Sequence, residues 1–235
     1  MKPHRSHKAA IAAFAALTLL SAANAATVLV TDGTNNDFGD AGGVAIDFDA
    51  TTGLAADWVA DLSTSQTYFI DSLTLFRATN EASTGTVYLG VYTSIGASPG
   101  KTLGGFQGVS TNTINLSTLG QNAPFTFTFS GFSVTPQQNP ASGGDIRYFV
   151  FQTGTTALAN IDLSVRVPIR RIDDNTTPAG FSHQLAAVLQ RGHPTEFLRT
   201  GRAPEYSATI TPIPEPSALA LLGIAGAVIA ARRRR

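Results

Sequence analysis

Apolar and polar residues alternate along most of the chain between residues 27 and 211, and this is the period of an extended strand. The intervening positions are mostly polar or small, as at Thr126, Thr128 and Ser164, so one face of each strand is expected to meet solvent. Half-buried strands of this kind predict an antiparallel sheet. The apolar positions with this period are Val28/Val30, Val44/Ile46/Phe48, Val87/Leu89/Val91, Phe125/Phe127/Phe129 and Ile161/Leu163/Val165/Val167.

Two further stretches, Leu73–Phe76 and Ile146–Phe151, are apolar on both faces and are expected to lie in the middle of a sheet. Turn signals rich in Gly, Pro, Asp and Asn separate the stretches. The pattern predicts roughly nine or ten short strands in an all-β, antiparallel β-sandwich of the jelly-roll type, with a closed barrel as the alternative. Its core is expected to include Leu89, Phe127, Val150 and Leu163.

One part of the body, residues 168–205, lacks this alternation. Leu185, Val188 and Leu189 fall at helical spacing within Ser182–Arg191. We therefore expect one short surface helix over Ser182–Arg191. Alternation returns at Tyr206–Thr211, which is the last expected strand.

The first 25 residues have the three parts of a secretory signal peptide. A basic segment through Lys8 precedes an apolar run from Ala9 to Leu20, and small residues end at Ala23 and Ala25. The apolar run is too short for a stable membrane span. We expect passage through the secretion translocon and cleavage by signal peptidase after Ala25, since Ala23 and Ala25 are small enough for the subsites of the peptidase.

The last 24 residues also contain three parts: Pro214-Glu215-Pro216, an apolar stretch from Ala218 to Ala231, and the four arginines Arg232, Arg233, Arg234 and Arg235. At a helical rise of about 1.5 Å per residue the apolar stretch spans roughly 21 Å, whereas the hydrocarbon core of a bilayer is about 30 Å thick. A transmembrane helix of this length can insert but is a marginal permanent anchor. The positive-inside rule places the arginines on the cytoplasmic side of the membrane and the body on the other side.

In the order and place of these parts, the tail resembles the PEP-CTERM sorting signal of bacterial proteins. The resemblance implies that an exosortase, an intramembrane cysteine transpeptidase, recognises Pro214-Glu215-Pro216 and removes the tail while the precursor is in the inner membrane. The prolines keep the motif extended and outside the helix, so that a protease can bind its main chain at the membrane surface. A simple C-terminal tail anchor is the alternative.

A second resemblance concerns the body. Tyr68–Arg77, followed by Gly85–Tyr92 and Pro99-Gly100, is similar to the choice-of-anchor sandwich domains that often accompany this tail. That resemblance implies an architecture like the one of carbohydrate-binding sandwiches. We therefore divide the chain into a signal peptide (1–25), a β-sandwich domain (26–211) and a sorting signal (212–235).

Composition and charge exclude several classes of function. The chain has no cysteine, so disulfides, thiolate zinc sites and a cysteine nucleophile are excluded. Residues 26–211 carry 9 Lys and Arg against 15 Asp and Glu, whereas both ends of the chain are basic. An acidic body of this kind is a poor candidate for binding nucleic acid, and we expect no nucleic-acid partner.

Candidate catalytic groups are few, and the chain has no Gly-x-Ser-x-Gly elbow, phosphate loop or dinucleotide fingerprint. Adjacent acids in an acidic domain usually form solvated surface, so we expect no enzymatic activity and no catalytic residue. The titratable groups considered are His183, His193 and the carboxylate pairs Asp47/Asp49 and Asp57/Asp61.

Oxygen ligands are concentrated in the expected loop between Asp32 and Asp40. Asp32, Asn36, Asp37 and Asp40 could bind Ca²⁺, which prefers carboxylate and carbonyl oxygens from a flexible loop. The loop is not an EF-hand, because Asp37 occupies the place of the required glycine. Asx and Gly residues also form ordinary turns, so a calcium site and a plain turn both remain open.

Aromatic residues could give the body a sugar-binding face, because a flat ring suits the apolar face of a sugar. Tyr88 and Tyr92 share one face of their strand, opposite Val87, Leu89 and Val91. Aromatic residues on sandwich strands also serve cross-strand packing. The candidates are Trp58, Tyr68, Tyr88, Tyr92, Tyr148 and Tyr206.

Together these observations predict a secreted, non-enzymatic protein that an exosortase routes to the cell surface. It is expected to be a structural or interaction component of the envelope or of the extracellular polysaccharide matrix. A carbohydrate-binding module is the alternative, and a secreted glycan-active enzyme is a third possibility. Stacking aromatics on one exposed face would favour the module, and a cleft with two carboxylates would favour the enzyme.

Overall fold

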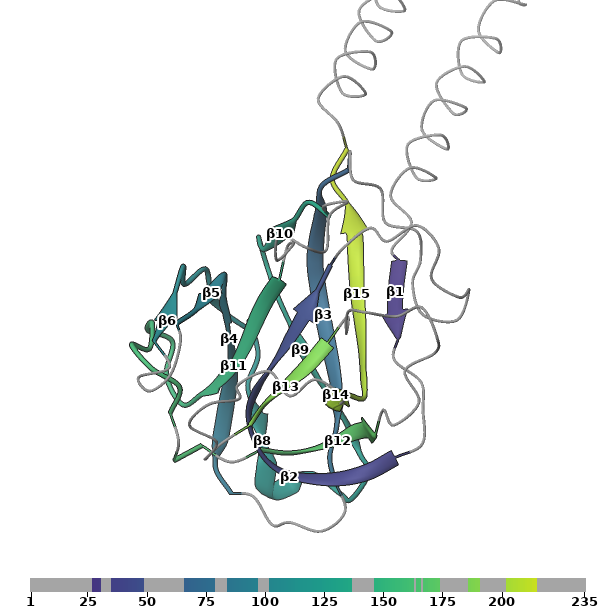
Figure 1. Cartoon of the computed structure of the whole chain (residues 1–235), viewed down its shortest axis with the longest axis vertical. Helices are drawn as coiled ribbons and strands as arrows, with labels where there is room; N and C mark the ends of the chain where they lie inside the picture. The colour runs from purple at the N-terminus through teal and green to yellow at the C-terminus, as the bar shows by residue number, and fades with distance from the viewer. Residues whose placement is uncertain are drawn as a thin grey trace, which may run out of the picture.

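A computed structural model describes residues 27–30, 35–48, 66–78, 84–96, 102–136, 146–162, 164–165, 167–173, 186–190 and 202–214. These residues form β-strands, turns and a single turn of 3₁₀ helix, η1 (Leu116–Thr118), and no α-helix occurs among them. Every pairing between the strands is antiparallel. The all-β, antiparallel class expected from the sequence is therefore confirmed (Figure 1).

The first sheet has β3 (Tyr68–Phe76) at its centre. Strand β15 (Tyr206–Pro212) pairs with one edge of β3, and β9 (Pro124–Thr128) and β10 (Ser133–Val134) pair with the other. Strand β1 (Thr27–Val30) continues the sheet beyond β15. The central position of β3 confirms the expectation for Leu73–Phe76.

The second sheet has the strand order β14 (Arg202–Pro204), β12 (Val167–Asp173), β2 (Asn35–Asp47), β11 (Ile146–Gln152), β4 (Thr86–Tyr92) and β7 (Gly108–Val109). Strand β13 (Ala186–Gln190) also pairs with β2, and β8 (Ile114–Asn115) also pairs with β4. A separate ribbon consists of β5 (Ser94–Ile95) and β6 (Leu103–Gly104). Strand β11 lies between β2 and β4, which confirms the central position expected for Ile146–Phe151.

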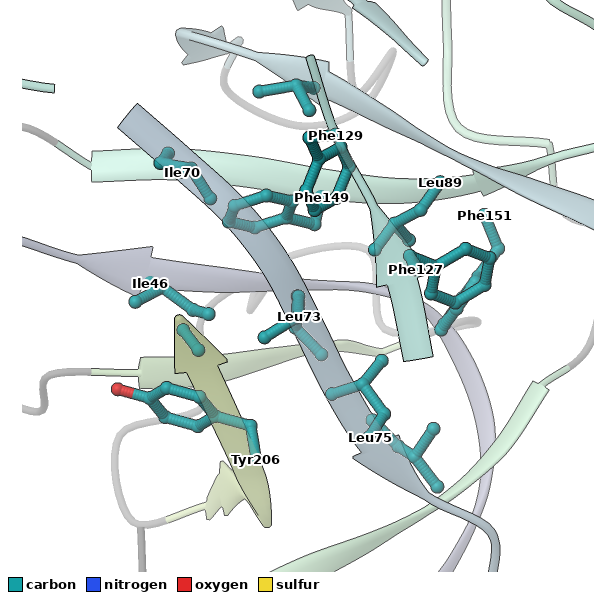
Figure 2. Packing of buried hydrophobic residues seen from close by; sticks show 14 of the residues in the cluster. Ile46, Ile70, Leu73, Leu75, Leu89, Phe127, Phe129, Phe149, Phe151 and Tyr206 are labelled. Carbon is teal, nitrogen blue, oxygen red and sulfur yellow. The ribbon is translucent and has the colours of Figure 1, made fainter. Parts of the chain in front are cut away.

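The main hydrophobic core lies between the two sheets, as in a β-sandwich (Figure 2). Leu73, Leu75 and Phe127 of the first sheet are fully buried, as is Leu89 of the second. The ring centroids of Phe127 in the first sheet and Phe151 in the second are 6.2 Å apart. Phe127 and Leu89 were expected in the core and are found there. The jelly-roll assignment stays a prediction.

A second hydrophobic cluster covers the other face of the second sheet. It contains Tyr92, Tyr148 and Val150, which alternate along β4 and β11 with residues of the main core. Partly buried side chains of the β5–β6 ribbon, Ile95 and Leu103, pack against it. Val150 is therefore buried as expected, but in this outer cluster, and Leu163 lies outside the described residues.

The expected surface helix over Ser182–Arg191 is wrong. Its described part is strand β13 (Ala186–Gln190), which pairs with β2 in a register that places Val188 opposite Val44. Leu185, Val188 and Leu189 have helical spacing, but a helix of about ten residues is marginal without tertiary support. Because β12 pairs with β2 only as far as Ala41, the edge beyond it is available to β13, and sheet pairing overrides the weak helical preference.

The expected strand from Ile161 to Val167 is also wrong in its first part. The main chain turns at Asp162, whose carboxylate accepts hydrogen bonds from the main-chain N–H (2.9 Å) and the hydroxyl (2.6 Å) of Ser164. These bonds lower the pKa of Asp162. An Asx turn of this kind competes with strand pairing, and β12 begins only at Val167.

The segment that lacks alternation in the sequence contributes three strands, β12, β13 and β14, to the second sheet. Within β12, Arg170 forms an ion pair with Glu205 at 3.1 Å, and its guanidinium carbon lies 5.9 Å from the centroid of the Phe76 ring. The main-chain N–H of Glu205 donates to the carbonyl of Arg170 at 3.0 Å. The charge of Arg170 is therefore compatible with its place in β12, because Glu205 lies beside it and compensates the charge.

Candidate functional site

The C-terminal end of β15 is the place where the body meets the tail. Pro212 is the last residue of the strand and pairs with Tyr68, the first residue of β3. Strand β10 lies at the same end of the sandwich (Figure 1). We call the contacts of the next residue, Ile213, with Gln66 and Thr67 the tail clamp.

Both main-chain polar groups of Ile213 take part in the tail clamp. Its N–H donates to the carbonyl of Thr67 at 2.7 Å. Its carbonyl accepts a hydrogen bond from Nε2 of Gln66, and the same amide nitrogen donates to the carbonyl of Thr67 at 2.9 Å. The hydroxyl of Thr67 lies 2.8 Å from that of Thr135, so the clamp is also joined to the segment that follows β10.

The local sequence explains why pairing ends here. Proline has no main-chain N–H, so Pro212 and Pro214 cannot donate a hydrogen bond to β3 or to the chain that precedes it. Ile213, which lies between them, is the last residue before Pro214 that can donate. Ile213 is half-buried, whereas Pro214 is exposed. The contacts of the folded body thus extend to Ile213, and the next residue, Pro214, is exposed.

The matched family model begins at this place. Residues 212–235 match the PEP-CTERM protein-sorting motif. The motif marks an exported protein that an exosortase recognises and processes at the membrane, which confirms this part of the expectation from the sequence. No curated protein and no solved structure is significantly similar to the chain.

Most of the residues assigned to sorting lie outside the described residues. These are Ala23 and Ala25 of the signal peptide, Glu215 and Pro216 of the motif, and Arg232, Arg233, Arg234 and Arg235. Pro214 is described and exposed. The described part of the chain contains no helix long and apolar enough to cross a membrane, and the expected transmembrane helix over 218–231 lies outside that part.

The expected calcium loop is only partly described. Asp32 is outside the described residues, whereas Asn36, Asp37 and Asp40 belong to β2, which pairs with β12 in this region. Asn36 lies opposite Arg171 and Asp37 opposite Arg170 in the register. These three positions are therefore in a paired strand and not in a loop. Within the described ranges, no group of three or more His, Asp or Glu is placed to hold a metal ion, and calcium binding stays a prediction.

The expected aromatic face is not built from the tyrosines singled out above. Tyr92 is fully buried in the outer cluster, and Tyr68, Tyr148 and Tyr206 are buried as well. Tyr88 is half-buried, and Trp58 lies outside the described residues. Among the described residues, the exposed large hydrophobic side chain is Phe69, with 39% of its surface accessible. Cross-strand packing therefore accounts for most of these rings.

A buried polar network surrounds Tyr92. Its hydroxyl donates to Oε1 of Gln152 at 2.9 Å and accepts from the main-chain N–H of Leu158 at 2.9 Å. Nε2 of Gln152 donates to the carbonyls of Gly154 (2.7 Å) and Thr156 (3.1 Å). Burial raises the pKa of Tyr92, and the hydrogen bond from Leu158 opposes this shift. The network fixes the loop after β11 onto the sheet.

The candidate catalytic groups are not assembled by the described residues. His183, His193, Asp49, Asp57 and Asp61 lie outside them. Asp47 ends β2 and pairs in register with Ile146.

Sequence reasoning missed Gln66 and Thr67 altogether. Gln66 is 147 positions from Ile213 along the chain, so no local pattern signals their contact.

Proposed function

We propose that this protein is carried across the inner membrane, processed by an exosortase-type transpeptidase and delivered to the cell surface. There its β-sandwich body serves, without enzymatic activity, as a structural or interaction component of the envelope or of the extracellular polysaccharide matrix. The observation that carries this proposal is the sorting motif at residues 212–235.

The position of the motif relative to the fold supports the proposal. Strand β15 ends at Pro212, the residue at which the matched segment begins. Between the clamped Ile213 and the apolar stretch from Ala218 there are four residues, which span at most about 14 Å. In the precursor the body is therefore held close to the membrane in which the exosortase acts.

The outer face of the first sheet supports an interaction role. Two rows of neutral hydroxyl residues cross it, because Ser207 pairs with Thr74 and Thr74 with Thr126, while Thr209 pairs with Ser72 and Ser72 with Thr128. All six positions are exposed or half-buried. Hydroxyl groups both donate and accept hydrogen bonds, which suits contact with a hydrated polysaccharide.

The proposal can be tested in the producing bacterium by measuring the intact mass of the protein and fractionating the cells. The mature form should begin at Ala26, lack the apolar tail and Arg235, and occur in the surface or matrix fraction. A protein that keeps Arg235 and remains in the inner membrane would refute exosortase processing and favour the simple tail anchor.

The role of the body needs a separate measurement. Binding of the mature protein to the polysaccharide of its own producer should be lost or weakened when Thr126 and Thr128 are both replaced by Lys, whereas replacing the exposed Gln107 by Lys should have little effect. Equal binding by both variants would argue against the hydroxyl face as the contact surface.

A further inference from the structure

We propose that Gln66 is a positioning residue for the sorting reaction: it keeps the carbonyl of Ile213 from the enzyme, while the pairing of β15 with β3 engages the main chain that precedes it. This inference rests on the proposed function, because it concerns how the exosortase meets the motif. It predicts that the mature C-terminus lies at or after Pro214.

The first step of the argument is that the tail clamp occupies every main-chain polar group available at Ile213. The N–H is bonded to the carbonyl of Thr67, and the carbonyl to Nε2 of Gln66. Upstream of Ile213 the chain is paired with β3 from Tyr206 to Pro212. The main chain before Pro214 is therefore engaged in the fold.

The second step concerns the enzyme. A peptide recognised in extended form binds its enzyme through main-chain hydrogen bonds on alternate sides, as an added strand does. Residues whose N–H and carbonyl are already bonded inside the sandwich cannot make such bonds without first unpairing. Pro214, which is exposed, is therefore the first residue that the enzyme can bind in the folded precursor without unpairing the sandwich.

The chemical step is that of a cysteine transpeptidase. The enzyme thiol attacks the scissile carbonyl, a thioester forms, and the peptide C–N bond breaks as the thiol proton passes to the departing amine of the tail. An acceptor amine or water then takes the acyl group and restores the thiol. Gln66 takes no part in these steps. It only determines whether the enzyme thiol can reach the carbonyl of Ile213.

Gln66 is central to the clamp because one amide nitrogen serves two carbonyls, those of Thr67 and Ile213. Methionine at this position has a similar length but no donor, so Gln66→Met should free the Ile213 carbonyl. Lysine keeps an N–H donor on a flexible side chain, so Gln66→Lys should restore the clamp. Gln107→Met makes the same chemical change at an exposed glutamine and is the matched control.

The experiment has two readouts on the full-length chain. Hydrogen exchange of the precursor in detergent, without exosortase, reports on the N–H of Ile213, which is bonded to the carbonyl of Thr67. We expect its exchange to increase about 2- to 10-fold in Gln66→Met, because Ile213 is then held by one of its two main-chain hydrogen bonds. Mass spectrometry of C-terminal peptides from the producing bacterium measures the cleavage position. The wild type, Gln66→Lys and Gln107→Met should end at or after Pro214, whereas Gln66→Met should give an additional C-terminus at Ile213.

The outcomes separate the two proposals. A wild-type chain that is never processed refutes the proposed function. A wild-type chain that is processed before Pro214, or a Gln66→Met variant with unchanged exchange, refutes the clamp alone. The clamp is also refuted if exchange at Ile213 increases in Gln66→Met while its C-termini remain those of the wild type.

Discussion

The hydroxyl group of Tyr92 donates a hydrogen bond of 2.9 Å to Oε1 of Gln152, in the cluster that covers the outer face of the second sheet. Both side chains are fully buried. The pair joins β4 to the end of β11, and the amide of Gln152 then holds the loop at Gly154 and Thr156. A tyrosine that could have stacked on a sugar is thus part of the interior.

Removing the Tyr92 hydroxyl should destabilise the body. In Tyr92→Phe, Oε1 of Gln152 and the N–H of Leu158 lose their partner, and leaving buried polar groups unpaired costs about 1–3 kcal/mol. Urea unfolding of the mature protein measures the change in free energy. Tyr88→Phe, at a half-buried position of the same strand, should change it by less than about 0.5 kcal/mol. Similar losses in the two variants would contradict the role given to the network.

The raised pKa of Tyr92 predicts an alkaline loss of stability. The hydroxyl ionises near pH 10 in the unfolded chain, whereas burial keeps it protonated to higher pH in the folded protein. Its contribution is therefore complete below about pH 10 and is lost as the pH rises through the folded value. Thermal unfolding between pH 9 and 11 should show a shallower decline for Tyr92→Phe than for Tyr88→Phe. An equal decline in the unfolding temperature of the two variants would show that ionisation of Tyr92 does not cause the alkaline loss of stability.

Truncating a ring in the main core should have a larger effect. Phe127 is fully buried against Phe151, so Phe127→Ala should cost about 3–5 kcal/mol. Phe69→Ala makes the same change at an exposed site of the first sheet and should cost about 0.5 kcal/mol or less. Denaturant midpoints of the two variants provide the comparison, and equal midpoints would show that the ring of Phe127 is not buried in solution.

A methyl group at Gly90 should disturb the Tyr92 network. A Cβ built there lies 2.2 Å from Oε1 of Gln152 and 3.0 Å from Cε2 of Tyr92, so both buried side chains would have to move. Overpacking of this kind costs about 1–3 kcal/mol. Gly154→Ala is the control, because a Cβ there meets no atom within 4 Å. Unfolding midpoints should fall for Gly90→Ala and not for Gly154→Ala, and the reverse order would contradict the packing described.

Recognition of the tail should depend on Glu215. It is the charged residue between the clamped Ile213 and the apolar stretch, so Glu215→Ala should leave unprocessed precursor in the inner membrane. Replacing Arg232, Arg233, Arg234 and Arg235 by Ala should instead disturb membrane topology. Fractionation and protease accessibility distinguish the two defects. Normal processing of Glu215→Ala would show that the exosortase does not recognise the charge of Glu215.

Local patterns in the sequence determined much of the architecture. Alternation around Phe127 and Leu89 predicted inward-facing positions because successive residues of a strand point to opposite faces, whatever their partner strand is. The stretches Leu73–Phe76 and Ile146–Phe151 are apolar on both faces, and a strand of this kind is expected to lie in the middle of a sheet. The tail could be recognised because its proline motif, apolar stretch and arginines follow one another along the chain.

The tertiary structure alone decided which apolar face is covered and by what. The β5–β6 ribbon and the loop after β11 bury Tyr92, and an available edge of β2 makes Ala186–Gln190 a strand, although its sequence favours a helix. Gln66 and Ile213 are 147 positions apart in the sequence, so the residues around neither of them predict their hydrogen bond. The spacing of apolar residues along the sequence indicates which face of a strand is buried. The partner of a strand and the hydrogen bonds at its end depend on groups that only folding brings together.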